Sequence, residues 1–257
     1  MENINPEKTL QFIVRFLKQT FKKAKFSRAI IALSGGIDSS LAFTLAAKTL
    51  GKNKVFPILL PYGKLNEQGV ADALELIKKL GIPRNHITQI NIKNPVDEVT
   101  RIDPKMDILR KGNIMARIRM TFVFDQAKRH RALVVGTENK SEYLLGYFTR
   151  FGDGASDIEP LRNLYKTHVY QLAEFMHLPK SILTKQPSAG LWENQTDEGE
   201  FGFSYKDADR VLYYYFDKKL SVGEIVKRDL KKTTVDRVLQ FAKKNNFKHG
   251  LPLIANL

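Results

Sequence analysis

The stretch AIIALSGGIDSSLAFTLAAKTL, residues 29–50, decides the fold class. Its first five residues are apolar, which is typical of a buried strand, and its last ten have the composition of a helix that Gly51 ends. The residues between them, SGGIDSS at 34–40, therefore form a loop that leads from a strand directly into a helix. A strand followed at once by a helix is the repeating unit of parallel α/β folds.

The same alternation continues on both sides of this stretch. We expect further strands at residues 55–60, 86–92 and 132–135. We expect helices at residues 9–23, 69–80, 113–129 and 166–177, an irregular segment at 95–111, and helical structure throughout 204–246. The sequence thus predicts an α/β protein with a three-layer α/β/α, Rossmann-like parallel sheet and a helical C-terminal part, folded as a single domain over residues 1–257.

Composition excludes several classes of protein. The chain has 257 residues and no cysteine, which excludes disulfides, thiolate metal sites and a cysteine nucleophile. No apolar run approaches the roughly 20 residues of a membrane helix, and the first residues lack a signal peptide's apolar core, so we expect a cytoplasmic protein with no membrane partner. The net charge of +15 would attract nucleic acids or phosphorylated small molecules. The basic residues are dispersed and form no nucleic-acid motif, so we expect no nucleic-acid partner.

The loop at residues 34–40 has the properties of a phosphate site. Two adjacent glycines let successive backbone N–H groups approach an anion, and the following helix adds the partial positive charge of its N-terminus. Ser34, Ser39 and Ser40 add hydroxyl donors. A plain turn would explain a lone Gly-Gly pair better, but it does not explain the whole heptapeptide. Because no Lys follows the last glycine, the loop is not a Walker loop, and transfer of a γ-phosphoryl group is disfavoured.

The SGGxDS pattern resembles the loop of the N-type ATP pyrophosphatases, which cleave ATP between its α- and β-phosphates. That superfamily includes GMP synthetases, asparagine synthetases, tRNA thiolases and NAD synthetases, so the loop alone indicates only the half-reaction. Asp38 then suits a ligand of the Mg²⁺ that neutralises the leaving pyrophosphate.

Further blocks name one family within that superfamily. From Ile30 to about Pro252 the chain resembles the short, ammonia-dependent NAD synthetases, whose fold is adenine nucleotide α-hydrolase-like. The matching blocks are KGNIMARIRM at 111–120, GTENKSE at 136–142, GYFTRFGDGASD at 146–157, LYKT at 164–167 and KQPSAGLWENQTDEGEFG at 185–202. The resemblance implies a homodimer that makes NAD from deamido-NAD, ATP and ammonia in the last step of NAD biosynthesis.

The resemblance also implies a role for each matching residue. Asp38 and Lys166 would be catalytic, and Asp38 and Glu142 would hold Mg²⁺. ATP would contact Ala32, Leu33, Ser34, Gly35, Gly36, Ile37, Asp38, Ser39, Thr137, Lys166 and Ser188. Deamido-NAD would contact Arg117, Arg150, Asp157 and Lys248.

Two of these positions depart from the family pattern. Arg150 stands where many relatives have Lys, which keeps the charge but changes the donor geometry. The tail reads Phe247-Lys248-His249 where many relatives read His-Lys-Arg, so only Lys248 can be carried over.

The implied reaction has two steps. The nicotinate carboxylate attacks the α-phosphorus of ATP to give an acyl adenylate and pyrophosphate, and ammonia then displaces AMP. No protein nucleophile is needed, which agrees with a chain that lacks cysteine. The polar segment 185–203 carries the only Trp and the apolar Leu191, Phe201 and Phe203, and we expect it to be a lid that excludes water.

Two other functions remain open. A tRNA-modifying enzyme with the same loop would fit the charge of +15, but thiolation usually requires cysteines. A nucleotide sensor without activity would have no use for Asp38, Glu142 and Lys166. Pyrophosphate release with deamido-NAD, compared with release in the presence of tRNA, separates the three.

Overall fold

The computed structural model describes residues 1–250 and 255, so Pro252, where the resemblance ends, lies outside them. The strands are β1 (Ala29–Ala32), β2 (Val55–Leu59), β3 (Thr88–Gln89) and β4 (Leu133–Val134). The helices of the first half are α1 (Pro6–Ala24), α2 (Ile37–Leu50), α3 (Glu67–Lys79), α4 (Lys93–Thr100) and α5 (Ile108–His130). The later helices are α6 (Lys140–Leu145), α7 (Lys166–Phe175), α8 (Lys180–Leu183), α9 (Asp197–Phe201), α10 (Tyr205–Leu212), α11 (Val222–Val226) and α12 (Lys232–Asn245).

The sheet places the loop after β1 at its centre. Among the described residues, four parallel strands lie in the order β3-β2-β1-β4. Ala29 of β1 pairs with Val55 of β2 on one side and with Leu133 of β4 on the other. The strands β2 and β3 are therefore added on one side of β1 and β4 on the other, so the strand order reverses next to β1. In open α/β sheets, ligands bind at the carboxyl ends of the strands at such a reversal.

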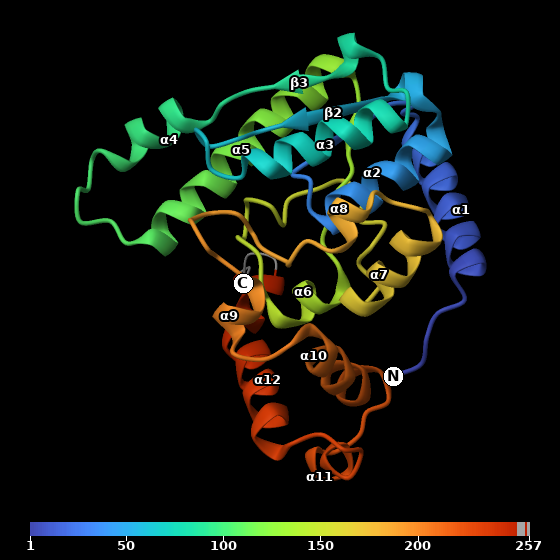
Figure 1. The fold of residues 1–257 in the computed structure, drawn as a ribbon, viewed down its shortest axis with the longest axis vertical. Helices are drawn as coiled ribbons and strands as arrows, with labels where there is room; N and C mark the ends of the chain where they lie inside the picture. Colours follow the sequence, from blue (N-terminus) through green and yellow to red (C-terminus); the bar gives the residue numbers. More distant parts are fainter. Residues whose placement is uncertain (251–254, 256–257) are drawn as a thin grey trace.

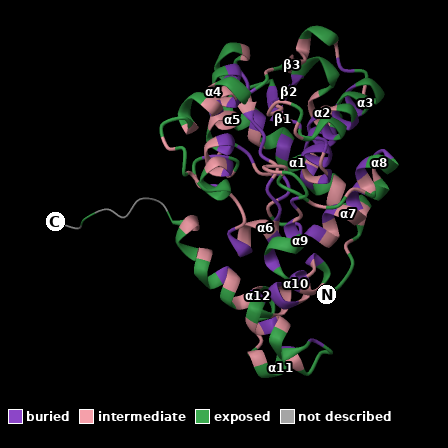
Figure 2. Ribbon diagram, turned by 60° about the vertical axis from the view of Figure 1, so that its left-hand side comes forward, coloured by how far each residue is buried: buried purple, intermediate pink, exposed green. Residues whose placement is uncertain are grey.

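Consecutive residues of β1 face opposite layers of helices. Ile31 packs in one hydrophobic cluster with Leu17 of α1 and Leu41 of α2. Ile30 packs in another with Met115 of α5. Figure 2 shows buried residues gathered around β1 and β2. The predicted three-layer α/β/α arrangement is confirmed.

The C-terminal helices have a core of their own. Phe201 of α9, Leu212 of α10 and Val235 of α12 pack together, and Leu145 and Tyr165 from the middle of the chain join them. Figure 1 shows α9–α12 below the sheet, with α6 and α7 between the two parts. We refer to residues 197–245 as the helical part.

Three local predictions differ from the structure. Part of the segment expected to be irregular at 95–111 is helical, because α4 covers it up to Thr100 and α5 begins at Ile108. Because Val96 is the only buried residue of α4, the apolar periodicity of this helix is too weak to predict it. The strand expected at 86–92 is reduced to β3, and residues 84–86 form a short 3₁₀ helix.

The stretch 204–246 is not one continuous helical run. A π-helical turn, η3 (Tyr213–Asp217), follows α10, and the chain then turns at Lys219 and Asp229, where φ is +57° and +56°. Ser221 starts α11 with a capping box to Glu224. The turns use residues other than Gly and Pro, so composition did not mark them.

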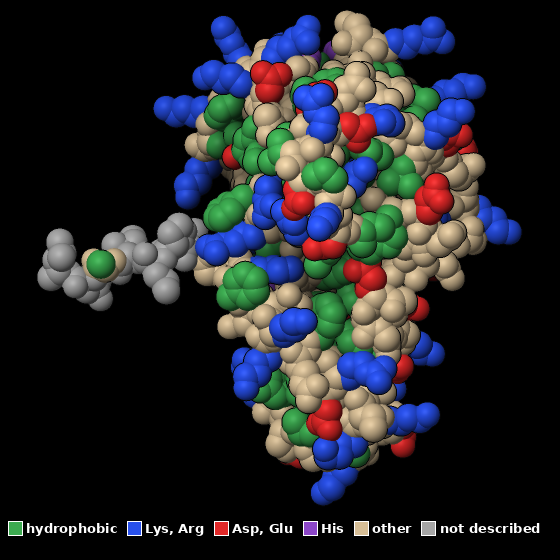
Figure 3. Space-filling view, turned by 90° about the vertical axis from the view of Figure 1, so that its left-hand side faces the viewer, with side chains coloured by type: hydrophobic (Ala, Val, Ile, Leu, Met, Phe, Trp, Pro, Cys, Tyr) green, Lys and Arg blue, Asp and Glu red, His purple; other side chains and the backbone are tan. Residues whose placement is uncertain are grey.

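The described helices include none that is long and apolar enough to cross a membrane. Figure 3 shows Lys and Arg side chains scattered over the face that it presents, with apolar and acidic side chains among them. The spread of positive charge along the sequence is thus also a spread over this surface.

Candidate active site

The loop after β1 is held by a close approach of two backbones. Gly35 has a φ of +75°, and a Cβ added there would lie 2.0 Å from the carbonyl oxygen of Gly69 in α3. Asn66, which caps α3, donates its Nδ2 to the carbonyl oxygen of Ser34 at 3.3 Å. Only glycine fits at position 35.

Serine hydroxyls fix the rest of the loop. The Oγ of Ser39 accepts the backbone N–H of Ser34 at 3.2 Å and donates to the carbonyl oxygen of Gly36 at 3.1 Å. Gly36 is the N-cap of α2 and makes no side-chain capping bond. Among the described residues, the first N–H groups of α2 have no side-chain acceptor, which is the arrangement that binds an anion at a helix N-terminus.

Three predicted residues meet at the start of α2. The Nζ of Lys166 lies 2.6 Å from Oδ2 of Asp38 and 3.1 Å from Oε1 of Glu142. Asn139 donates its Nδ2 to the other oxygen of Asp38 at 2.8 Å. The Lys166 side chain is 3% exposed and the two carboxylate side chains are each 16% exposed. We refer to Asp38, Asn139, Glu142 and Lys166 as the charged cluster.

Burial shapes the electrostatics of this cluster. Burial raises the pKa of Glu142, Lys166 opposes this effect, and nearby Asp38 adds to it. Burial alone would lower the pKa of Lys166, but Asp38 and Glu142 outweigh it, so the pKa of Lys166 lies above its ordinary value. Lys166 is therefore a fixed positive charge beside the loop.

The donor set of the cluster fits a magnesium ion of the kind that nucleotides bring with them. Asp38 and Glu142 offer hard carboxylate oxygens that converge on one cation, Lys166. Mg²⁺ is commonly held by one or two carboxylates, with phosphate oxygens and water completing its shell. Within the described residues, no group of three or more His, Cys, Asp or Glu side chains could hold a metal by itself. The two carboxylates would thus need phosphate oxygens to complete a site.

Two predicted ATP contacts, Thr137 and Ser188, belong neither to residues 32–39 nor to the charged cluster. Thr137 follows β4, beside Gly136, whose N–H donates to the carbonyl oxygen of Ile158 at 2.8 Å. Ser188 is exposed, and its Oγ accepts the N–H of Gly190 at 3.1 Å. In the part of the chain that the structure describes, neither side chain hydrogen-bonds to residues 34–39. Both remain predictions.

The predicted cations of the substrate site gather around residues 146–150. Lys248 donates its Nζ to the carbonyl oxygens of Gly146 at 2.7 Å and Phe148 at 3.0 Å. Arg117 donates to the carbonyl oxygen of Arg150 at 3.4 Å, and Arg150 donates to that of Gly250. Burial lowers the pKa of Lys248. These cations are therefore near one another, although backbone carbonyls engage each of them.

Asp157, the predicted acid of the substrate site, is bound to the sheet. Its Oδ2 accepts the backbone N–H of Val134 at 2.7 Å. The carboxylate therefore has a structural partner at the edge strand β4, while the residue itself remains exposed.

The segment expected to be a lid, 185–203, divides into two halves. Phe201 and Phe203 are buried in the core of the helical part, so the expectation that they belong to a lid is wrong. Leu191 and Trp192 are half-buried near Gly112 of α5, where an added Cβ would lie 3.0 Å from Leu191 Cδ1. Of the apolar side chains in this segment, only Leu191 and Trp192 in its first half therefore have the partial exposure expected of a lid.

Sequence reasoning missed several residues that shape this site. Lys185 donates its Nζ to the carbonyl oxygen of Gly35 at 3.1 Å and pairs with the buried Asp72 of α3. Asn139 forms a capping box with Glu142, and the spacing Asn-x-x-Glu could have revealed it. No comparable spacing marks Lys185.

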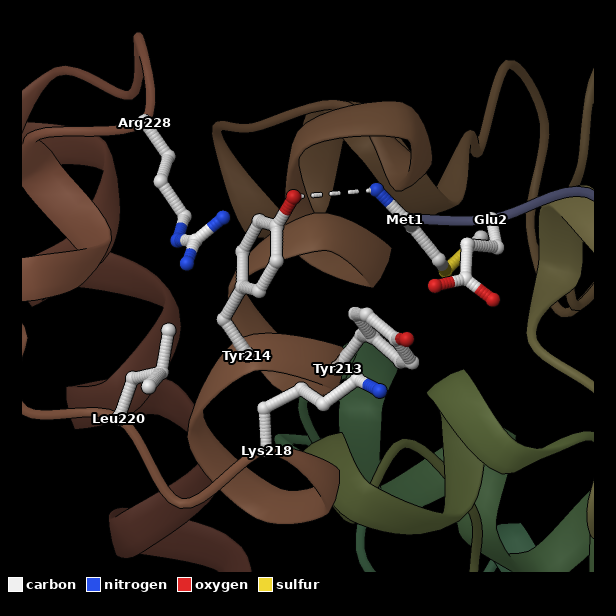
Figure 4. A pocket seen from close by; sticks show the side chains of 7 residues that line it. All are labelled: Met1, Glu2, Tyr213, Tyr214, Lys218, Leu220 and Arg228. Atoms are coloured by element: carbon white, nitrogen blue, oxygen red, sulfur yellow. Dashed lines mark hydrogen bonds between the residues drawn. The ribbon is translucent and has the colours of Figure 1, made fainter.

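The hollow drawn in Figure 4 lies far along the chain from the loop, in the helical part and at the N-terminus. It has a volume of about 280 Å³ and is lined by Met1, Glu2, Tyr213, Tyr214, Lys218, Leu220 and Arg228. Its cations are engaged within the protein, because Lys218 lies 5.3 Å from the ring centre of Tyr213 and Arg228 lies 4.8 Å from that of Tyr214.

The chain is similar in sequence and in fold to known proteins. The NH₃-dependent NAD⁺ synthetase of Pyrococcus furiosus is 42% identical over 255 residues, which cover 98% of this chain and 96% of that protein. Among solved structures, an NMN synthetase from Francisella tularensis matches with a TM-score of 0.86 and 34% identity over 99% of this chain and 100% of that chain. An NH₃-dependent NAD synthetase from Campylobacter jejuni, in complex with nitrate, matches with a TM-score of 0.83 and 30% identity over 98% of this chain and 100% of that chain.

A sequence profile of the NAD synthase family also matches residues 9–252. The match includes the loop, the charged cluster and the cations around residues 146–150. The likeness in sequence and the likeness in fold point to the same enzymes, and this chain belongs to the NAD synthase family.

Proposed function

We propose that this chain is an ammonia-dependent NAD synthetase, which amidates deamido-NAD at the cost of ATP and releases AMP and pyrophosphate. The observation that carries the proposal is the charged cluster beside the loop at residues 34–40, in a chain that belongs to the NAD synthase family. The loop binds phosphate by its backbone, and the cluster places charge beside it.

In the first step, the nicotinate carboxylate attacks the α-phosphorus of ATP, and the bond to the β-phosphate breaks. The N–H groups of α2 and the hydroxyl of Ser34 hold the phosphates in place, while Ser39 fixes the shape of the loop through its bonds to Ser34 and Gly36. Lys166 stabilises the negative charge that gathers on the departing pyrophosphate. Positioning and fixed charge carry this step, because no covalent intermediate with the protein is required.

Asp38 and Glu142 would hold Mg²⁺ together with the phosphates of ATP. When bound, the ion neutralises the leaving group. Its arrival would give the two carboxylates a second positive partner besides Lys166.

Deamido-NAD would lie along Arg117, Arg150 and Lys248, whose charges suit its phosphates and carboxylate, with Asp157 accepting from a hydroxyl. In the second step, ammonia displaces AMP from the acyl adenylate. The first half of the 185–203 segment, which includes Ser188, Leu191 and Trp192, would cover the adenylate and exclude water.

Two features of the assembly belong to this proposal. Residues 1–257 would act as one NAD synthetase domain, since the charged cluster takes its residues from distant segments of the chain, namely α2, α6 with the residue before it, and α7. The enzyme would be a homodimer, as the resemblance implies, and sedimentation at micromolar concentration tests this directly. A fully active monomer would contradict it.

The deciding experiment measures NAD and pyrophosphate formed from deamido-NAD and ATP with ammonium or glutamine as nitrogen donor. We expect ammonium to support the reaction and the rate to rise with pH as more ammonia is unprotonated. Glutamine should fail, because its hydrolysis in amidotransferases commonly uses a cysteine nucleophile and the chain has none. Pyrophosphate release that depends on tRNA instead of deamido-NAD would contradict the proposal.

The likeness to the Francisella tularensis NMN synthetase favours a second candidate substrate. Nicotinate mononucleotide carries the same reacting carboxylate as deamido-NAD and lacks the adenylyl half. The ratio of kcat/KM for the two substrates in the same assay decides between them. We expect deamido-NAD to be preferred, and a preference for the mononucleotide would reassign the enzyme as an NMN synthetase with the same chemistry.

A further inference from the structure

Lys166 is the first residue of α7, and that helix is capped from elsewhere in the molecule. Its own N-cap residue, Tyr165, makes no side-chain capping bond. Instead, Asp209 of α10 accepts the backbone N–H of Thr167 on its Oδ2 at 2.8 Å. Asp209 is 0% exposed. A buried carboxylate from the helical part thus takes the place of a local cap at the positive end of α7.

A single hydroxyl connects Asp209 to both sides of the charged cluster. Ser141 donates its Oγ–H to Oδ1 of Asp209. The Oγ of Ser141 also accepts the backbone N–H of Lys166 at 2.8 Å. Ser141 precedes Glu142 on α6 and is itself 0% exposed. Asp209 therefore fixes the backbone that carries Lys166 and, through Ser141, the backbone that carries Glu142.

The same face of α10 also contacts the end of the lysine side chain. Tyr205 lies four residues before Asp209, which places both on one side of the helix. The Nζ of Lys166 lies 4.9 Å from the ring centre of Tyr205, and the Tyr205 hydroxyl donates to buried Asp197 at 3.0 Å. α10 thus holds Lys166 at its backbone and at its ammonium group.

On the basis of the proposed function, we propose that Asp209 is a positioning residue for adenylation, acting on the reaction through Lys166. Asp209 is fully buried behind α6 and α7, so it would act without touching the nucleotide. Its effect is to keep the Nζ of Lys166 at the point where the pyrophosphate leaves. Displacing a reacting group by about 1 Å can lower a rate by about 100-fold, so a fixed backbone at Lys166 bears directly on kcat.

The first variants are Asp209→Asn, which removes the charge but keeps the shape, and Ser141→Ala, which cuts the bond to the Lys166 N–H and leaves Asp209 in place. The matched control is Asp236→Asn, on the exposed side of α12. We expect each of the first two to lower the kcat of pyrophosphate release by about 10- to 100-fold with the KM for ATP almost unchanged. The control should keep its kcat.

A double-mutant cycle separates positioning from general support of the fold. Lys166→Ala is measured alone and together with Asp209→Asn. If Asp209 acts through Lys166, the double variant has the kcat of Lys166→Ala alone. An equal fold-loss in both backgrounds, or a lower melting temperature at unchanged kcat, would overturn the proposal. If Asp209→Asn does not fold, Ser141→Ala carries the same cycle.

The wild-type assay keeps this test distinct from the test of function. A wild-type enzyme that releases pyrophosphate only with an acceptor other than deamido-NAD would overturn the proposed function. The positioning role would then still be judged by the same cycle, with that acceptor in the assay.

Discussion

The two ends of the candidate active site are built in opposite ways. The loop end, residues 34–39, comes from one continuous segment and offers backbone N–H groups and hydroxyls. The charged cluster collects single side chains from α2, α6 and α7 and the residue before α6, and relies on α10 behind them. The comparison indicates that the loop is sensitive to the shape of the backbone, whereas the cluster is sensitive to the charge of its side chains.

The largest effect is expected from neutralising the cluster. Asp38→Asn and Glu142→Gln keep the side-chain shape, so the fold should survive, but each removes a negative charge that would hold Mg²⁺. We expect pyrophosphate release to fall by about 100- to 1000-fold or more, by analogy with other charge-stabilising groups. Circular dichroism and melting temperature serve as controls for folding. Near-normal release of pyrophosphate by either variant would contradict the assignment of that residue as a Mg²⁺ ligand.

At the loop end, the largest effect is expected from a substitution that changes the shape of the backbone at Gly35. Gly35→Ala should weaken ATP binding at least ~10-fold and lower stability by about 1 to 3 kcal/mol, because the added Cβ meets the Gly69 carbonyl. Gly81→Ala is the matched control, since its φ is +64° and its Cβ would lie 3.8 Å from the Lys52 side chain. ATP titration and thermal unfolding check both variants. Equal losses of ATP affinity in the two would show that the close approach to Gly69 does not matter.

The stability of the protein should depend on pH through Glu138, the residue that precedes Asn139 of the charged cluster. Burial, only partly offset by Arg162, raises the pKa of Glu138 to about 9. Between its ordinary pKa and this value the folded protein holds a proton that the unfolded chain lacks. Stability therefore falls as pH rises through this window, by at most about 1.4 kcal/mol per pH unit.

The variant Glu138→Gln removes this dependence, because glutamine does not titrate. We expect it to gain stability relative to the wild type between pH 5 and pH 8, measured by urea unfolding at both values. Glu98→Gln on the exposed side of α4 is the control. If the two variants change in parallel with pH, Glu138 is not held in its protonated form.

The smallest effect is expected at Ser188, which would add one hydroxyl to the loop end. Loss of one hydrogen bond of about 0.5 to 1.5 kcal/mol should raise the KM for ATP by roughly 2- to 10-fold in Ser188→Ala. Steady-state kinetics with varied ATP measure the change. An unaltered KM would remove Ser188 from the ATP site.

The contrast between the two ends also explains what the sequence could predict. The loop lies between an apolar strand and an apolar helix, so its place in the fold followed from residues 29–50 alone. The meeting of Asp38, Glu142 and Lys166 followed from family resemblance and not from spacing, since 128 residues separate Asp38 from Lys166. The chemical roles of these residues remain predictions.

What the sequence could not reveal depends on contacts between distant segments. Asp209 is one of two acids in α10 and follows Thr167 by 42 residues, so its sequence position does not distinguish it from a surface charge. Gly69 looks like a residue near the start of a helix until its backbone meets Gly35. Phe201 and Phe203 were read as part of a lid because a core made by α10 and α12 has no signature within residues 185–203.

The cap that Asp209 gives to α7 has a consequence for the order in which the protein is made. A ribosome completes the loop and every residue of the charged cluster before it reaches α10. At about 5 to 20 residues per second, about 2 to 8 s separate Thr167 from Asp209. During that interval the nascent chain already has the loop at residues 34–40, while α7 still lacks its distant cap. The growing polypeptide can therefore complete the contacts behind Lys166 only when α10 has been made.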